Sequence, residues 1–326
     1  MKDVKKIELH LHLEGAAPPA FIRGLATEKG TDLSAIFDNY GHYAYRDFDD
    51  FLRVYEAATS VIRTPQDYAR LVREVLGNCA EQGAIYAELF VSPEFCGGGD
   101  LAAWRDYLGA MEEAAAEMAA QGIDSRAILT LIRHFGPERG RATAICAAET
   151  GSADRTGWVT GVGLAGAEAV GRPQDFAWSF DCAREAGLGL TCHAGEWDGP
   201  QSVRDALSLG VSRIGHGVRS IEDPSLLDEL AQREIVLEIC PGSNVALGVY
   251  PDWSAHPIAR LTDAGIRVTV STDDPPFFHT TLNHEYERLA EVFRWGRQEF
   301  SSQNITAAGA AFCDTETHAR LLAQLS

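Results

Sequence analysis

The sequence contains no Cys-x-x-Cys pair, and it has no apolar run of the roughly 18 residues that a membrane helix needs. Its seven cysteines are odd in number and widely spaced: Cys79, Cys96, Cys146, Cys182, Cys192, Cys240 and Cys313. Such cysteines are typical of small buried side chains in a reducing compartment. The pattern His-x-Glu followed by Pro-Cys-x-x-Cys is also missing, which excludes a zinc enzyme of the cytidine-deaminase type.

Positive charge is scarce as well. The chain has 28 Lys and Arg residues against 47 Asp and Glu residues, and this net charge of −19 argues against nucleic acid or an anionic membrane surface as a partner. The N-terminus reaches no apolar stretch of signal-peptide length, so we expect a cytoplasmic protein without a membrane span. With 45% hydrophobic and 23% charged residues, positions 1–326 are expected to form a single domain with a sizeable core.

Short β-branched runs alternate with longer helical patterns along the chain. The strand-like runs are Ile7–Leu11, Ile85–Val91, Arg126–Ile132, Val159–Leu164, Gly189–Cys192, Arg213–Ile214, Ile235–Ile239 and Arg267–Val270. The helical patterns include Asp67–Gln82, Leu101–Gln121, Gln174–Ala186, Ser225–Gln232 and Pro257–Ala264. Eight strands alternating with helices favour an α/β fold, the (β/α)8 TIM barrel. The alternative, an open doubly wound sheet, lacks the Gly-x-Gly-x-x-Gly turn after its first strand.

The segment between the first two strands breaks this alternation. It contains extra N-terminal helical patterns at Pro18–Lys29 and Asp47–Arg63. An insertion after a barrel strand emerges at the end that carries active sites. Asp47–Arg63 is therefore interpreted either as a lid over the barrel mouth or as extra packing against it.

Polar, reactive residues follow the predicted strands at the end where barrel enzymes place their chemistry. His10 and His12 point the same way if their segment is extended, because strand side chains have a period of two. Together with His193 and Asp273 they offer three imidazoles and one carboxylate. That donor set suits one zinc ion with an open position for water, and zinc lowers the pKa of bound water from about 16 to near 7.

Three more residues are candidates for catalysis. Glu196 lies three residues after His193, in the turn that leaves the strand, so it can enter the site without binding the metal. His216 stands between two glycines, and Asp274 diverges from Asp273 if the backbone stays extended, which leaves one carboxylate free to handle a proton. Each residue of the site also has a structural explanation when taken alone: His193 could be a buried histidine whose hydrogen bonds are satisfied, and an Asp-Asp-Pro sequence is more often a turn or a helix N-terminus.

At these positions the chain resembles the adenosine deaminase family of the amidohydrolase superfamily. The resemblance extends from Lys6 to the C-terminus and rests on these motifs: Glu8-Leu9-His10-Leu11-His12-Leu13-Glu14-Gly15, Leu164-Ala165-Gly166, Cys192-His193-Ala194-Gly195-Glu196, Arg213-Ile214-Gly215-His216-Gly217, Cys240-Pro241-Gly242-Ser243-Asn244 and Ser271-Thr272-Asp273-Asp274-Pro275.

The resemblance implies a barrel with one zinc ion per subunit that removes the 6-amino group of a small purine as ammonia. It implies that the ligands are His10, His12, His193 and Asp273, and that the catalytic residues are Glu196, His216 and Asp274. Substrate would contact His12, Glu14, Asp274 and the backbone N–H of Gly166. A proton from Glu196 to N1 makes C6 open to attack by the activated water, while either His216 or Asp274 takes the proton of that water.

The substrate depends on where the chain departs from the family pattern. Glu14 stands where adenosine deaminases carry an Asp near the ribose, and Gly163-Leu164-Ala165-Gly166-Ala167-Glu168 stands where they tend to read Asp-Leu-Ala-Gly-Asp-Glu. Adenine deaminases share the Glu and the Cys-Pro-x-Ser-Asn motif, whereas Glu88–Glu94 is closer to the nucleoside enzymes. We expect adenosine and deoxyadenosine, converted to inosine and deoxyinosine; the alternatives are adenine, converted to hypoxanthine, and another 6-aminopurine derivative.

Two other classes of protein are less compatible with the sequence. Growth-factor-like members of the family carry secretion signals and glycosylation sites, and here Asn304-Ile305-Thr306 is a lone Asn-x-Thr without a signal. A two-metal amidohydrolase acting on amides or esters needs a bridging lysine or its equivalent. None of the predicted strand ends carries a lysine.

Overall fold

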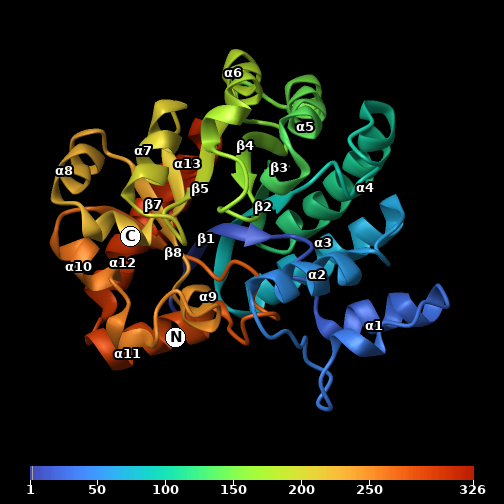
Figure 1. Cartoon of the computed structure of the whole chain (residues 1–326), viewed down its shortest axis with the longest axis horizontal. Helices are drawn as coiled ribbons and strands as arrows, with labels where there is room; N and C mark the ends of the chain where they lie inside the picture. The colour runs from blue at the N-terminus through green and yellow to red at the C-terminus, as the bar shows by residue number, and fades with distance from the viewer. Residues whose placement is uncertain (2) are drawn as a thin grey trace.

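Eight parallel strands follow one another around a barrel in the computed structural model, which describes residue 1 and residues 3–326 (Figure 1). They are β1 (Lys6–His12), β2 (Ala84–Val91), β3 (Asp124–Ile132), β4 (Val159–Ala165), β5 (Gly189–Ala194), β6 (Arg213–His216), β7 (Val236–Ile239) and β8 (Arg267–Val270). The prediction of a (β/α)8 barrel is confirmed, and the predicted strand ends differ from the observed ones by no more than two residues.

The barrel closes at a seam between β1 and the residues just after β8. Leu11 and Asp273 form a parallel bridge. The His12 N–H donates to the Asp273 carbonyl, and the Asp273 N–H donates to the His10 carbonyl, both at 3.0 Å. The backbone bonds that close the barrel therefore also fix Asp273 beside the two histidines of β1.

Helices surround the strands (Figure 1). They are α1 (Pro19–Glu28), α2 (Phe48–Thr59), α3 (Pro65–Glu81), α4 (Leu101–Ala120), α5 (Pro137–Thr150), α6 (Ala177–Glu185), α7 (Pro200–Ser208), α8 (Pro224–Gln232), α9 (Pro241–Ala246), α10 (Ile258–Asp263), α11 (Leu282–Phe293), α12 (Arg297–Ala310) and α13 (Thr315–Leu325). Short 3-10 turns occur at Ser34–Ile36, Arg133–Phe135, Pro173–Phe176, Val218–Glu222 and Trp253–Ala255. The expected helices between the first two strands are present as α1 and α2, followed by α3.

The insertion helix α2 has a clear start signal in the sequence. The side chain of Asp47 accepts a hydrogen bond from the Asp50 N–H, which satisfies one of the free donors of the first turn. Phe51, Val54 and Ala58 then lie three or four residues apart and are buried on one face. Helix α2 therefore packs on the barrel through that face.

Phe312, from the loop between α12 and α13, helps to fill the barrel interior. Its ring contacts Phe90 and Ile128 in one buried cluster. Space for the ring comes from β5, because a Cβ atom on Gly189 would lie only 2.4 Å from it. The guanidinium of Arg213 lies 3.7 Å from the centre of the same ring.

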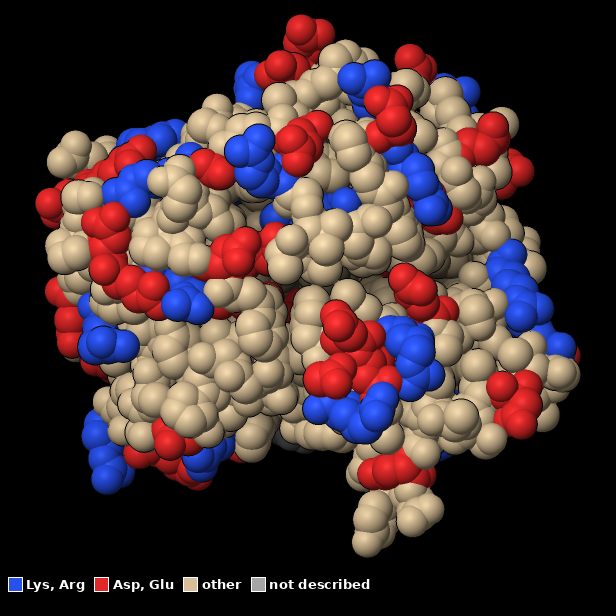
Figure 2. Space-filling model, in the orientation of Figure 1, with Lys and Arg blue, Asp and Glu red and all other residues tan. Residues whose placement is uncertain are grey.

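The surface agrees with the composition. Acidic and basic side chains are interspersed over the face shown in Figure 2. All seven cysteines are free, and six of them are buried, as expected. Asn304 of the lone Asn-x-Thr sequence is also buried, with its side-chain oxygen accepting from the Ile7 N–H at 2.9 Å. Among the described residues, no helix has both the length and the apolar character that crossing a bilayer requires.

Candidate active site

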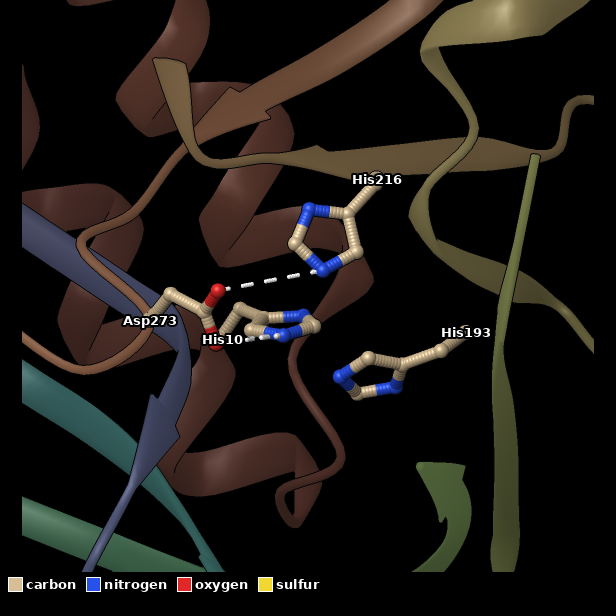
Figure 3. Close-up of side chains that lie close together, drawn as sticks. All are labelled: His10, His193, His216 and Asp273. Atoms are coloured by element: carbon tan, nitrogen blue, oxygen red, sulfur yellow. Dashed lines mark ion pairs between the residues drawn. The ribbon is translucent and has the colours of Figure 1, made fainter. Parts of the chain in front are cut away.

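Four buried side chains meet at the mouth of the barrel (Figure 3). His10, His193, His216 and Asp273 each present a potential ligand atom, and these atoms lie within 4.8 Å of one another. The residues come from β1, β5, β6 and the seam after β8. The structure thus brings together three of the four predicted metal ligands.

The fourth predicted ligand, His12, reaches the same point. Its Nε2 lies 3.2 Å from both the Nε2 of His193 and the Oδ1 of Asp273. His216, predicted to act in catalysis, stands slightly farther out, with its Nε2 3.9 Å from the Oδ2 of Asp273. Five donors therefore surround one point, which is more than a catalytic zinc ion takes from the protein in its usual coordination.

The orientation of His10 suits a metal ligand. Its Nδ1 lies 2.8 Å from a carboxylate oxygen of Glu238, while its buried Nε2 has no hydrogen-bond partner. Metal-binding histidines in proteins are typically held in this way, with one ring nitrogen on a carboxylate and the other on the ion. Burial, followed by the nearby His10, His216 and His12, holds the pKa of His193 well below its ordinary value, and the neutral imidazole is the form that binds metal.

Glu238 belongs to a buried charge network at the base of the site. Its other oxygen accepts from the Thr191 hydroxyl at 3.0 Å and lies 2.6 Å from the Nε of Arg213. Arg213 pairs in turn with Glu88 at 2.6 Å. We did not predict this network from the sequence, although a signal was present: Glu88 and Glu238 are charged residues inside otherwise apolar strands.

Glu196 is held beside His216 by Asn244. The Asn244 amide donates to Glu196 at 3.0 Å, and its nitrogen lies 3.3 Å from the Nδ1 of His216. Burial, followed by the charges of Asp273 and Glu168, raises the pKa of Glu196 well above its ordinary value, so the protonated acid is favoured. Asn244 belongs to one of the family motifs in the sequence, but we predicted no role for it.

His216 is expected to be neutral at physiological pH, because burial lowers its pKa to about 4. Its backbone adopts a left-handed φ of 58°, and that of Asp273 a φ of 67°. Such conformations are uncommon in residues other than glycine and cluster at functional sites.

Asp274 lies directly over Gly15. A Cβ atom at residue 15 would lie 1.5 Å from the Oδ1 of Asp274, so only glycine leaves room for this carboxylate. That buried oxygen has no hydrogen-bond partner, and burial and the charge of Asp273 raise the pKa of Asp274. The neighbouring Glu14 accepts from the Tyr68 hydroxyl at 3.0 Å, and burial raises the pKa of Glu14 to about 7.

A cavity of about 750 Å³, which includes space open to solvent, lies above these groups. Every predicted site residue except His10 lines it, namely His12, Glu14, Gly166, His193, Glu196, His216, Asp273 and Asp274. Helix α2 contributes Phe48, Phe51, Leu52, Tyr55 and Glu56, so it lines the cavity as well as packing on the barrel. No lysine or arginine is found among the described residues that line the cavity.

Comparison with known proteins places the chain in a family. The family model for adenosine deaminase matches residues 5–326. The chain is 49% identical to an adenine deaminase of Rhizobium johnstonii over 99% of both proteins. It is 47% identical to an adenine deaminase of Agrobacterium fabrum over 98% of this chain and 97% of that protein.

Solved structures with the same fold include deaminases and amidohydrolases. The crystal structure of an adenine deaminase from Arthrobacter aurescens is similar with a TM-score of 0.89 and 27% identity, covering 98% of this chain and 97% of that one. An amidohydrolase from Burkholderia ambifaria with bound zinc has a TM-score of 0.86 and 26% identity, covering 99% of this chain and 89% of that one. The full-length match to the family model, together with relatives that are nearly half identical, shows that the chain belongs to the adenosine deaminase family.

Proposed function

We propose that this protein hydrolyses the 6-amino group of free adenine and releases hypoxanthine and ammonia. The observation that carries the proposal is the near full-length similarity, at 46–49% identity, to relatives named adenine deaminase. These relatives favour the alternative that the sequence left open. Adenosine and deoxyadenosine, the substrates first expected, become the second candidates.

The lining of the cavity supports an uncharged substrate. Helix α2 lines the cavity with Phe48, Phe51 and Leu52, and no lysine or arginine is found among the described residues that line it. A nucleoside phosphate would have to bury its charge there without a counter-ion, which is costly. A planar base with polar ring edges fits this combination of apolar walls and a few carboxyl groups.

A metal ion fits the donor set, since His10 offers a buried ring nitrogen without a partner and His193 is held neutral. We assign one zinc ion to His10, His12, His193 and Asp273. When bound, zinc acts as a Lewis acid that lowers the pKa of water toward 7. His216 remains available for catalysis in this assignment.

The side chains around the metal position supply the proton transfers. Protonated Glu196 donates to N1 of the purine, which draws electron density from C6 and opens it to attack by water. Asn244 holds the Glu196 carboxyl in place for this step. His216 and Asp274 orient the attacking water and take up its proton, and Gly166 offers its backbone N–H to a ring nitrogen of the base.

A substrate panel followed by ammonia release tests the proposal. We expect kcat/KM for adenine to exceed that for adenosine and deoxyadenosine at least tenfold. A tenfold preference for either nucleoside would restore the first expectation, and a lack of ammonia release from every 6-aminopurine would refute purine deamination.

Glu14 provides a second test of the same choice. Free adenine carries a ring N–H where a nucleoside carries its sugar, and Glu14 lines the cavity as a buried acceptor. Glu14→Ala should cost about 1–3 kcal/mol in kcat/KM on adenine, because that contact is lost. Tyr68→Phe, which removes only the donor to Glu14, should cost less. If Glu14→Ala impairs adenosine and spares adenine, Glu14 binds a ribose and the nucleoside is the substrate.

A further inference from the structure

Glu168 is a buried carboxylate to which the mechanism above gives no role. It lies in the loop after β4, two residues beyond Gly166, and is 6% exposed. Glu168 is not one of the described residues that line the cavity. Its side chain instead turns toward the next loop of the barrel, the one that follows β5.

The Glu168 carboxylate accepts hydrogen bonds from four backbone N–H groups of that loop and from one hydroxyl at the start of α7. Its Oε1 accepts from the Gly195 N–H at 2.6 Å and from the Ser202 hydroxyl. Its Oε2 accepts from three further backbone N–H groups, those of Glu196 at 3.1 Å, Trp197 at 2.8 Å and Asp198 at 3.1 Å. A charged acceptor with this many N–H partners fixes the local backbone strongly.

The backbone that is fixed carries the proposed proton donor. Gly195 has a left-handed φ of 69°. A Cβ atom at this position would lie 2.4 Å from the side chain of Val203, so the turn is closely packed as well as hydrogen-bonded to Glu168. On the cavity side, Asn244 holds the carboxyl of Glu196. Glu196 is thus hydrogen-bonded at its backbone N–H to Glu168 and at its side chain to Asn244.

We propose that Glu168 is a positioning residue for the deamination. It ties the loop of Gly166 to the loop of Glu196, so that a backbone N–H and an acid proton reach the same purine ring from two different strands. The inference rests on the proposed function. Proton transfer is sensitive to such placement, because a shift of about 1 Å can cost a factor of about 100 in rate.

A second role for Glu168 has to be separated from this one. Through Ser202 it also contacts the first turn of α7, and it could serve only to stabilise that helix. If Glu168 only stabilises α7, its replacement should lower activity by the same factor whether or not Glu196 is present. Positioning of Glu196 has an effect only while Glu196 is present to donate its proton.

Glu168→Gln keeps the size of the side chain but removes its charge and turns an NH₂ group toward N–H donors. We expect kcat on adenine to fall at least tenfold, with a smaller change in KM. Ser202→Ala is the matched control, because it removes the contact with α7 and leaves the four backbone donors. It should stay within twofold of wild type.

A double-mutant cycle with Glu196→Gln then decides between the two roles. If Glu168 acts through Glu196, Glu168→Gln should change the residual turnover of Glu196→Gln by less than threefold. The affinity for hypoxanthine, whose N1–H donates to Glu196, should show the same pattern by calorimetry. It should fall on Glu168→Gln in the wild-type background and stay constant in the Glu196→Gln background.

Equal losses in both backgrounds would overturn the positioning role and leave only helix stabilisation. A wild type that does not deaminate adenine would refute the proposed function instead. The cycle is then measured with whichever 6-aminopurine the enzyme does deaminate.

Discussion

Burial and neighbouring charges shift the pKa of several single side chains near the cavity. Glu196 is the clearest case, because burial and two neighbouring carboxylates favour its acid form. Glu196→Gln keeps the shape and the contact with Asn244 but has no proton to give. We expect turnover to fall by at least the roughly hundredfold that is typical of a lost general acid.

Metal analysis provides the control for this variant. Glu196 is not an assigned ligand, so Glu196→Gln should keep the zinc content of the wild type. Loss of zinc in the variant would contradict the assignment and make Glu196 part of the metal site.

The metal ligands should behave differently. His193→Ala removes one of four assigned donors, so we expect it to lose most of its zinc and nearly all activity. His284→Ala, a change of an exposed histidine on α11, is the matched control and should keep both. Two equivalents of metal in the active wild type would argue for a two-metal site instead.

Among the secondary-structure elements, α2 both packs on the barrel and lines the cavity. Asp47→Ala removes the N-terminal cap of α2 and should destabilise the helix by about 1 kcal/mol. Because α2 lines the cavity, KM for adenine should rise together with the loss in thermal stability. Asp49→Ala, in the same turn but without the capping bond, should change both less. An unchanged KM in Asp47→Ala would mean that α2 serves only as packing.

The strands and the convergence of the site could be predicted from the sequence for a physical reason. Parallel barrel strands are buried on both sides, so they read as short apolar runs such as Ile85–Val91. The polar residues after each run then have to meet at one end of the barrel. His10, His193 and Asp273 lie together as expected, although about 260 positions separate the first from the last.

Helix α12 shows why other elements were missed. It packs against β1 and β8, yet its buried face includes Gln303, Asn304, Ala307 and Ala308. A helix whose buried side is polar or small has no apolar stripe to detect. The contact between Glu238 and His10 was not predicted either. The two residues are remote in sequence, and only the closed barrel brings them together.

For the molecule as a whole, buried carboxyl groups make stability depend on pH. Burial raises the pKa of Glu285 from its ordinary 4.5 to about 8. Between these values the folded protein binds more protons than the unfolded chain, so the free energy of unfolding should fall as the pH rises from about 5 to about 8.

Glu285→Gln isolates this contribution, because the amide resembles the protonated acid. We expect the variant to lose less stability than the wild type between pH 5 and pH 8 in chemical denaturation. Glu287→Gln, at an exposed position on the same helix, should follow the wild type. A steeper fall in Glu285→Gln would mean that the folded protein holds Glu285 ionised.

The seam between Leu11 and Asp273 sets an order of events during synthesis. In a growing chain, His10 and His12 are synthesised some 260 residues before their carboxylate partner Asp273. Until then β1 has no neighbour on one side and the histidines lack Asp273. A nascent or truncated chain that ends before β8 therefore cannot assemble the reactive centre, and the enzyme becomes competent only when its last strand has met its first.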